Sequence, residues 1–239
     1  MYQTIPWLAR LPREQVKRPA SLCWGYRTTL RDEHAGFANG SMPVNLLSRI
    51  DDYDLEHLPS KRRNQLRKCR REVDIVQITD PGVLQDQGYE VYCSAVNRLR
   101  LYNPPTREAY RQAVEEMFHS PDYLVVGALV GGKLGGYLEA YAVNGTAYIH
   151  HVFIATAMLR TNICTGMTFD LIQLCRRSQQ VQEVVYGQHS REKPSLDTFK
   201  EGLGFSVVHI PARFWFFPLA GRLIRWRKPH AHYRLSGQS

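Results

Sequence analysis

The side chains that could carry acid–base chemistry gather in one stretch of the chain. His150 and His151 are adjacent in the segment AYIHHVFIA, and Glu139 lies in the apolar segment before it, LGGYLEAYAV. An imidazole titrates near neutral pH and can take a proton from a reacting group in that range. A lone carboxylate in such a segment faces either solvent or a cleft. Glu139, His150 and His151 are therefore the candidate general bases.

Two strands must position these residues. The segments 134–143 and 146–154 are separated by Asn144-Gly145, and a further strand, 123–130, precedes them across a Gly-Gly pair. Both dipeptides supply the positive φ angles of tight hairpin turns, so the sequence predicts a three-stranded antiparallel meander. Consecutive side chains of a strand point to opposite faces. Only one of His150 and His151 is therefore expected to face a cleft.

The flanking segments predict a helical and strand framework around the meander. The first 47 residues are rich in Pro, Gly and Asn and predict an irregular extension packed on a main domain of residues 48–239. Before the meander we expect a short helix ending at Pro59, a basic helix (60–71), a strand (73–78) and two helices (83–100, 106–118). After it we expect a helix (162–178), a strand (183–186), a helix around Thr198, and strands at 205–210 and 232–235.

This order of elements resembles the GNAT acyltransferase fold over roughly Ser48 to Leu235. The basic helix LPSKRRNQLRKCRR and the late segment FKEGLGF look more like the FemAB-type branch, whose members include peptidoglycan-bridge aminoacyl transferases. The resemblance implies an α+β protein with a mixed, mostly antiparallel central sheet flanked by helices. It also implies an N-acyltransferase that moves an acyl group from a thioester carrier, acetyl-CoA or another acyl-CoA as cosubstrate, to an amine.

The resemblance places the carrier phosphates at the start of the helix after the third meander strand. There the chain reads LRTNICTGM, so Arg160 fits the opening basic position and the backbone of Asn162, Ile163, Cys164 and Thr165 would hold the phosphates. Ile163 and Thr165 stand where the family has close-approach glycines. Side chains at these two positions are expected to crowd a pyrophosphate.

A second departure from the family concerns the late helix. Many GNAT enzymes have a tyrosine four residues before the Gly of the Gly-Phe pair, where it protonates the leaving thiolate, and this chain has Lys200 there. A lysine could donate that proton, bind phosphate or lie on a solvated helix face. Beyond the strand near Val184, His189 and Ser190 are further candidates for ligand contacts, with a polar loop as the plain alternative.

The charge of the chain favours anionic partners. Lys and Arg number 31 against 22 Asp and Glu, for a formal charge of +9. Seven of the cations lie in the basic helix, which could contact nucleic acid, a nucleotide-linked acceptor or lipid headgroups. In residues 213–228 aromatic and aliphatic side chains alternate with arginines, and this composition suits peripheral contact with an anionic membrane. The alternative is an insertion packed over the cleft or a dimer contact.

Cysteine usage and hydropathy indicate a cytoplasmic protein, either free or peripheral to the inner face of the membrane. The five cysteines are widely spaced and contain no CxxC pair, so the sequence predicts reduced thiols and no metal site. Pro6, Arg10 and Pro12 interrupt the amino-terminal segment before a signal peptide can develop. The sequence contains no run of about 18 apolar residues, which is the length that a membrane-spanning helix needs.

Three readings of function remain open at this point. The first is the N-acyltransferase, with a small-molecule or amino-lipid amine as acceptor. The second is a FemAB-like transferase that uses aminoacyl-tRNA, which the basic helix favours. The third is a catalytically inactive GNAT-fold module that binds a membrane or nucleic acid, which the missing glycines and tyrosine favour.

Overall fold

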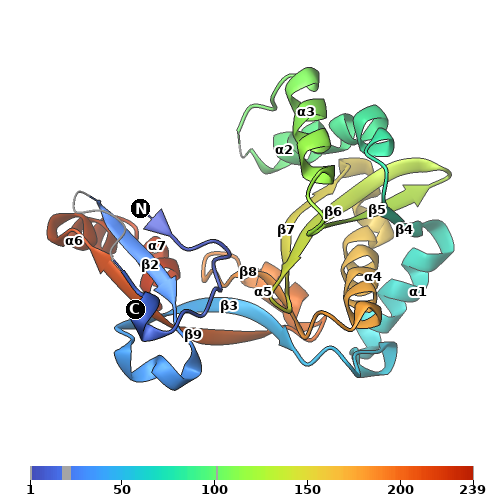
Figure 1. Cartoon of the computed structure of the whole chain (residues 1–239). Helices are drawn as coiled ribbons and strands as arrows, with labels where there is room; N and C mark the ends of the chain where they lie inside the picture. The colour runs from blue at the N-terminus through green and yellow to red at the C-terminus, as the bar shows by residue number, and fades with distance from the viewer. Residues whose placement is uncertain (1, 18–22, 101, 239) are drawn as a thin grey trace. The chain divides into compact units, whose positions relative to one another are not determined.

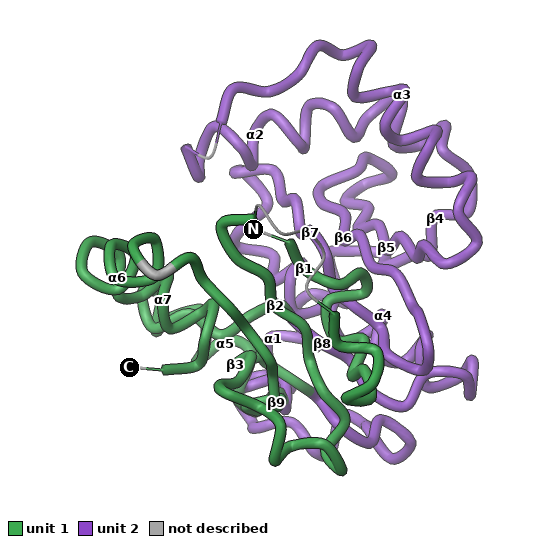
Figure 2. Tube along the Cα trace, turned by 60° about the vertical axis from the view of Figure 1, so that its left-hand side comes forward, with its two compact units in different colours: residues 1–46, 187–201, 205–239 green, residues 47–186, 202–204 purple. Residues whose placement is uncertain are grey.

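The computed structural model describes residues 2–17, 23–100 and 102–238. The chain divides into two compact units, shown in Figure 2. Unit 1 contains residues 1–46, 187–201 and 205–239, and unit 2 contains residues 47–186 and 202–204. Each unit is described by itself.

Unit 2 is built on the predicted antiparallel meander. Strands β4, β5, β6 and β7 pair in chain order, all antiparallel, and β8 pairs with β7 in parallel. The Gly-Gly and Asn-Gly turns have φ values between +51° and +78°, as the sequence predicts. The strands are β4 (Asp74–Ile78), β5 (Tyr123–Val130), β6 (Lys133–Val143), β7 (Thr146–Ile154) and β8 (Glu183–Gln188), whose last two residues belong to unit 1.

Helices cover both faces of this sheet (Figure 1). Helix α4 packs on one face with α1 beside it, and α2 and α3 lie over the other face. A π-helical turn, η4 (Leu84–Gly88), leads directly into α2. The helices are α1 (Ser60–Glu72), α2 (Tyr89–Leu99), α3 (Arg107–Phe118) and α4 (Ile163–Ser178), with 3-10 segments η3 (Leu55–His57) and η5 (Thr156–Thr161). All four helices lie where the sequence predicts them.

Successive side chains of β6 point to opposite faces of the sheet, and both faces need a covering layer of helices. A Cβ added to Gly136 would lie 3.1 Å from Ile163 Cγ2 in α4, so this face contacts α4 directly. The next residue, Tyr137, is fully buried on the other face in a cluster with Val91, Tyr110 and Phe153. A strand with apolar residues on both faces must be covered on both to bury them. The result is the mixed, mostly antiparallel, helix-flanked fold that the sequence predicts.

Unit 1 joins the first strands of the chain to its last one. Strand β9 is the centre: β2 pairs with one edge and β3 with the other, both antiparallel, and β1 pairs with β2 in parallel. The strands are β1 (Tyr2–Gln3), β2 (Gly25–Thr29), β3 (Gly40–Ser48) and β9 (Ser206–Phe216); the helices are α5 (Pro194–Glu201), α6 (Pro218–Arg227) and α7 (Pro229–Ser236); and the 3-10 segments are η1 (Arg13–Gln15) and η2 (Asp32–Phe37).

The prediction of a last strand at 232–235 is wrong, because this segment is helix α7. Pro229 starts the helix, where its missing N–H costs nothing, and Gly237 ends it with φ +71° and an N–H that donates to Tyr233 O at 2.7 Å. Residues 213–228 are consequently not an insertion between two strands. They form the end of β9 and the whole of α6.

No helix within the described residues has both the length and the apolar character needed to cross a membrane.

Gly166 allows α1 and α4 to approach each other closely. An added Cβ at this position would lie 2.7 Å from Cys69 Sγ in α1 and 3.3 Å from Ile75 Cδ1 in β4. Real Cβ atoms do not tolerate the first of these distances. Cys69 is fully buried, so its thiol cannot turn out to solvent.

We predict that Gly166→Ala lowers the free energy of unfolding by about 1–3 kcal/mol, because overpacking outweighs the helix-propensity gain of about 1 kcal/mol from alanine. Urea denaturation measures the change. In a Cys69→Ala background the sulfur is gone, and the same substitution should be neutral or stabilising. An equal cost in both backgrounds would show that the Cys69 contact is not the cause.

Candidate active site

A β-bulge brings both histidines of β7 to the same cavity. Glu139 on β6 pairs with His151, whereas the next residue, Ala140, pairs with Ile149, so His150 is an extra residue in the ladder. The two imidazole rings have centroids 3.9 Å apart, and both line one cavity together with Glu139. The expectation that only one could face a cleft is wrong, because a bulge breaks the strict alternation of faces.

Glu139 and His151 form a hydrogen-bonded pair. Glu139 Oε2 lies 3.0 Å from His151 Nδ1. A carboxylate accepts hydrogen bonds, so Nδ1 carries the proton and Nε2 of the neutral ring is left as an acceptor. The Glu139 side chain is 16% exposed and that of His151 is 47% exposed. The pair therefore combines a sheltered carboxylate with an accessible imidazole.

His150 is held in its neutral form by its surroundings. Burial lowers the pKa of His150, and the nearby His151 lowers it further, while Glu139 raises it. The ring is also in edge contact with Tyr141, with centroids 6.0 Å apart. At neutral pH His150 is thus a hydrogen-bonding imidazole without a fixed charge.

The cavity beside these three residues has a volume of about 360 Å³ and a largely apolar lining. It lies on the face of the sheet covered by α2 and α3, and residues of both helices contribute to it. Glu139 is the one carboxylate among its lining residues. The aromatic and aliphatic residues that line it are Tyr92, Tyr102, Tyr110, Val114, Met117, Tyr123 and Phe153.

The aromatic residues form a connected layer behind the cavity. The Phe153 ring lies 4.9 Å from Tyr92 and 5.1 Å from Tyr137, centroid to centroid. Tyr110 Oη donates to Tyr137 Oη at 3.1 Å, and burial raises the pKa of Tyr110 to about 12. These hydroxyls therefore stay protonated. These tyrosines are not identified in the sequence analysis, because they come from three separate segments. The spacing of Tyr89 and Tyr92, which lie on one helix face, is the local pattern that could have pointed to an aromatic cluster.

The start of α4 offers backbone groups rather than side chains to an anion. Asn162 has φ +60° and its carbonyl accepts from Gly166 N at 3.2 Å, while Arg160 is exposed in η5. The side chains of Ile163 and Thr165 are buried, and that of Ile163 lies against Gly135 and Gly136 of β6. The first N–H groups of a helix have no intrahelical acceptor. The predicted carrier site remains a prediction that rests on these groups.

Two further features surround the start of α4. Cys164 Sγ lies 3.7 Å from Tyr186 Oη, and burial raises the pKa of this thiol. The guanidinium of Arg62 in α1 interacts electrostatically with Cys164. Sequence reasoning counted Arg62 only as one cation of the basic helix. The structure brings it close to the predicted phosphate loop.

Lys200 lies in α5 of unit 1, is 4% exposed and is the one charged residue of that helix that is buried. Burial lowers its pKa from 10.5 to about 8, and the charge of Asp197 opposes this effect. The interpretation of Lys200 as a solvated surface charge is therefore wrong. Its predicted role as a proton donor stays a prediction.

His189 and Ser190 take part in a polar network within unit 1. His189 Nδ1 lies 2.7 Å from Tyr233 Oη, and its Nε2 lies 3.3 Å from Asp197 Oδ2. Arg234 donates to Ser190 Oγ at 3.2 Å and pairs with Glu192. Both nitrogens of His189 thus have partners of their own, which favours a structural role.

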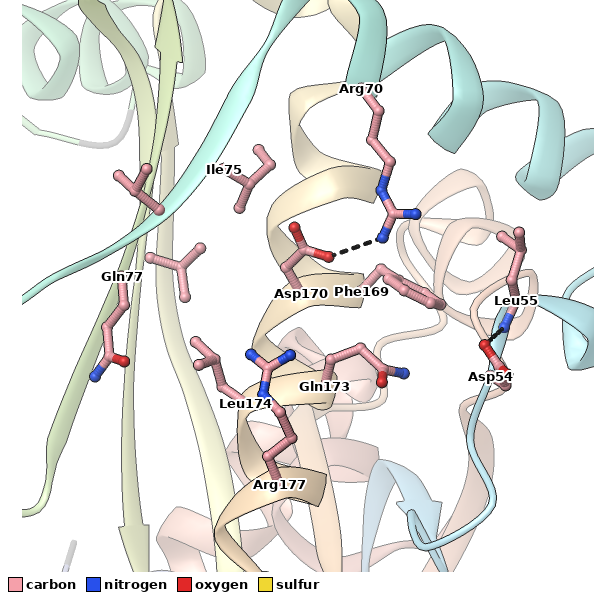
Figure 3. Close-up of a pocket in the computed structure, with 12 residues that line it drawn as sticks. Asp54, Leu55, Arg70, Ile75, Gln77, Phe169, Asp170, Gln173, Leu174 and Arg177 are labelled. Carbon is pink, nitrogen blue, oxygen red and sulfur yellow. Dashed lines mark hydrogen bonds and ion pairs between the residues drawn. The ribbon is translucent and has the colours of Figure 1, made fainter.

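A second, more polar cavity of about 520 Å³ lies beside α1, β4 and α4 (Figure 3). Arg70 Nη2 of α1 lies 3.3 Å from Asp170 Oδ1 of α4, and Arg177 lines the cavity about two turns further along α4. Burial raises the pKa of Asp170, while Arg70 lowers it. No imidazole or thiol is among its lining residues, whereas two imidazoles line the first cavity.

Three examples illustrate the similarity in fold between this chain and solved structures. The C-terminal domain (DUF2156) of a protein described as a lysylphosphatidylglycerol synthetase, from Agrobacterium fabrum, matches with a TM-score of 0.61 and 11% identity over 89% of this chain and 73% of that one. FemX matches with a TM-score of 0.57 and 8% identity over 77% of this chain and 63% of its own. A conserved protein of unknown function from Bacteroides thetaiotaomicron has a TM-score of 0.56 and 13% identity, over 80% and 68%.

At these identities the comparisons show a shared fold. A search with protein-family models gives no match, and neither does a search of curated protein sequences. The predicted likeness to FemAB-type proteins is confirmed for the fold by FemX, of which this chain spans less than two thirds.

We predict that the two neighbours of His150 move its pKa in opposite directions. Glu139→Gln removes the charge that raises it and should lower the pKa, whereas His151→Gln removes a competing cation and should raise it. An NMR titration of the imidazole resonances measures both. His119→Gln, at an exposed histidine of the same unit, should change nothing; shifts of the same sign in the two test variants would contradict this arrangement.

The lowered pKa of Lys200 predicts a pH dependence of stability. The unfolded chain binds a proton at Lys200 up to about pH 10.5 and the folded chain only up to about pH 8, so stability rises with pH between these values. At about 1.4 kcal/mol per pKa unit, the wild type should gain up to about 3 kcal/mol over Lys200→Met across this range. Denaturation curves at a series of pH values measure the difference. Parallel curves would show that Lys200 titrates normally.

Proposed function

We propose that this protein is an N-acyltransferase in which His151, oriented by Glu139, is the general base. The observation that carries the proposal is the bulge at His150, which gathers two imidazoles and a carboxylate at one cavity. The ligand atoms of these three side chains lie within 4.8 Å of one another. A base held by a carboxylate at its other nitrogen is a recurrent arrangement for removing a proton during acyl transfer.

The acceptor ammonium first loses one proton to solvent, and the reaction then needs one further proton transfer on the acceptor side. The neutral amine nitrogen attacks the thioester carbonyl, a C–N bond forms, and the C–S bond breaks as the thiolate leaves. His151 Nε2 takes the proton that the nitrogen loses, and Glu139 stabilises the imidazolium through its bond to Nδ1. The imidazolium of His151 then loses its proton to solvent and the thiolate gains one from solvent, so the products are an amide and the free thiol of the carrier. Neutral His150 lines the cavity as a hydrogen-bonding group without repelling an ammonium.

The lining of the cavity favours an acceptor with an apolar body and a single ammonium. One carboxylate, Glu139, faces several aromatic and aliphatic side chains in a volume of about 360 Å³. A polycationic acceptor would require several acidic partners to offset its desolvation. Aromatic rings bind apolar groups and also attract a cation over their faces. The acceptor class that fits is a hydrophobic primary amine, including an amine carried on a lipid.

The donor in this proposal is an acyl-CoA bound at the start of α4. Exposed Arg160 would pair with a phosphate, and the backbone N–H groups of residues 163–165 would donate to the pyrophosphate. Ile163 and Thr165 are buried, which supports an approach of the phosphates to the backbone rather than to these side chains. Arg62 adds a second cation near Cys164.

A second candidate is transfer from aminoacyl-tRNA. Its support is the exposed cations of α1, among them Lys61, Arg67 and Lys68, together with the fold shared with FemX. Phosphate contacts of this kind supply sequence-independent affinity for RNA. Both candidates use the same base, so the donor distinguishes them.

The first experiment is calorimetric titration of the protein with acetyl-CoA and with a long-chain acyl-CoA. Thiol release is then followed with hydrophobic monoamines and, for comparison, with an aminoglycoside. We expect saturable binding that Arg160→Ala weakens, and faster turnover with the monoamines. His151→Gln and Glu139→Gln should lower kcat by about 10²- to 10⁴-fold with little change in donor affinity.

The controls separate the alternatives. His119→Gln should retain wild-type turnover. Reactions are run with and without EDTA, because two imidazoles and a carboxylate this close together can also hold a divalent cation. Absence of binding to either thioester, with transfer from aminoacyl-tRNA, would replace the first candidate by the second. Absence of transfer from every donor would leave a binding module.

A further inference from the structure

Unit 1 exposes large apolar side chains on and beside helix α6. Trp226 is 76% exposed and Leu219 69% exposed, and Leu223, Phe217 and Trp24 are also exposed. We call these five residues the α6 surface. Exposed tryptophan is uncommon in a folded protein unless it has a partner, because its large ring gains most from leaving water.

The spacing of the helical members places them in one stripe. Leu219, Leu223 and Trp226 are at positions i, i+4 and i+7 of α6, which share one face of an α-helix. Ala220, Gly221 and Ile224 are only partly exposed and occupy the other side of the helix. Helix α6 thus has an inner side within unit 1 and an apolar outer side.

Two aromatic rings extend the stripe at the start of the helix. Phe217 N donates to Trp24 O at 2.9 Å, and the two rings meet edge to face with centroids 6.4 Å apart. Trp24 directly precedes β2, whose pairing with β9 fixes its position. The α6 surface is therefore supported by the sheet of unit 1 as well as by the helix.

The charged residues of α6 itself all have one sign. Arg222 and Arg227 lie on either side of the stripe by helical geometry, Arg225 and Lys228 are exposed nearby, and the Arg227 guanidinium lies 5.6 Å from the Trp226 ring centroid. The sequence contains no Asp or Glu after Glu201. A partner that accepts both features must offer an apolar phase directly beneath an anionic layer.

An anionic lipid surface has this structure. Leucine and tryptophan side chains insert at the boundary between headgroups and acyl chains, while arginine extends its charged end to lipid phosphates. A second copy of the chain would bring the same cations together, and the resulting repulsion disfavours it. An RNA partner would use the cations but would leave Leu219 and Leu223 in water.

We propose that the α6 surface is a membrane-docking element that binds anionic phospholipid bilayers, with the stripe of α6 lying parallel to the membrane plane. This inference does not depend on the proposed acyl transfer, because docking requires neither the cavity nor a donor.

Vesicle co-sedimentation of the whole protein, without donor or acceptor, tests the proposal. We expect at least about tenfold stronger binding to vesicles of phosphatidylcholine mixed with phosphatidylglycerol than to phosphatidylcholine alone, and a decline as salt screens the charges. Tryptophan fluorescence should shift to shorter wavelength on binding, because Trp24 and Trp226 leave water. Circular dichroism checks that each variant is folded.

Matched variants identify the surface. Leu223→Ser with Trp226→Ser should lower binding at least about tenfold, and Arg225→Glu with Arg227→Glu should remove the preference for anionic lipid. The controls are Leu99→Ser, an equally exposed leucine of unit 2, and Arg111→Glu with Lys133→Glu, exposed cations of unit 2. Both controls should bind as the wild type does.

Three results would overturn the proposal. One is a wild type that does not bind the mixed vesicles. Another is equal loss of binding in the control and test variants, which would indicate non-specific attraction by the net charge. The third combines two observations: the protein does not bind vesicles, and light scattering shows a dimer that Leu223→Ser dissociates. The stripe would then be covered by a second copy of the chain.

Discussion

One irregularity in the β6–β7 ladder determines what the meander can do chemically. In a regular ladder His150 and His151 would lie on opposite faces of a sheet that is covered by helices on both. The extra residue at His150 turns both rings toward the face of α2 and α3 and leaves Glu139 opposite His151. A bulge needs a rigid surrounding ladder to hold its geometry. The tight turns at both ends of β6 and the buried Tyr137 supply that rigidity.

The aromatic layer has two consequences for the residues in front of it. Tyr110, Tyr137 and Phe153 are buried behind the cavity and exclude water from its back, while the bond between Glu139 and His151 lies on the exposed side. Partial desolvation also makes an additional positive charge costly, and so lowers the pKa of His150. Packing and proton chemistry in this site thus have a common origin.

The parts of the fold that could be predicted from sequence are those coded locally. Gly131-Gly132 and Asn144-Gly145 specify the hairpins, and the helices of unit 2 follow from periodicity and from the Pro104-Pro105 break. The bulge has no local signal, because a register shift depends on which residue of β6 lies opposite. The cavity could not be predicted either, since its tyrosines come together only when α2 and α3 pack on the sheet. By contrast, Pro229 and Gly237 are start and stop signals of a helix, and the strand predicted at 232–235 did not take them into account.

The chain order of unit 1 imposes a sequence of events on biosynthesis. Its strands β2 and β3 are made first, yet the strand that lies between them, β9, ends at Phe216, after the whole of unit 2 has been synthesised. Until then β2 and β3 have open edges on a growing polypeptide, while residues 47–186 of unit 2 are contiguous and can collapse on the ribosome. The early strands therefore lack the partner they share until β9 has been synthesised, and their edges stay open to pairing with other strands until then.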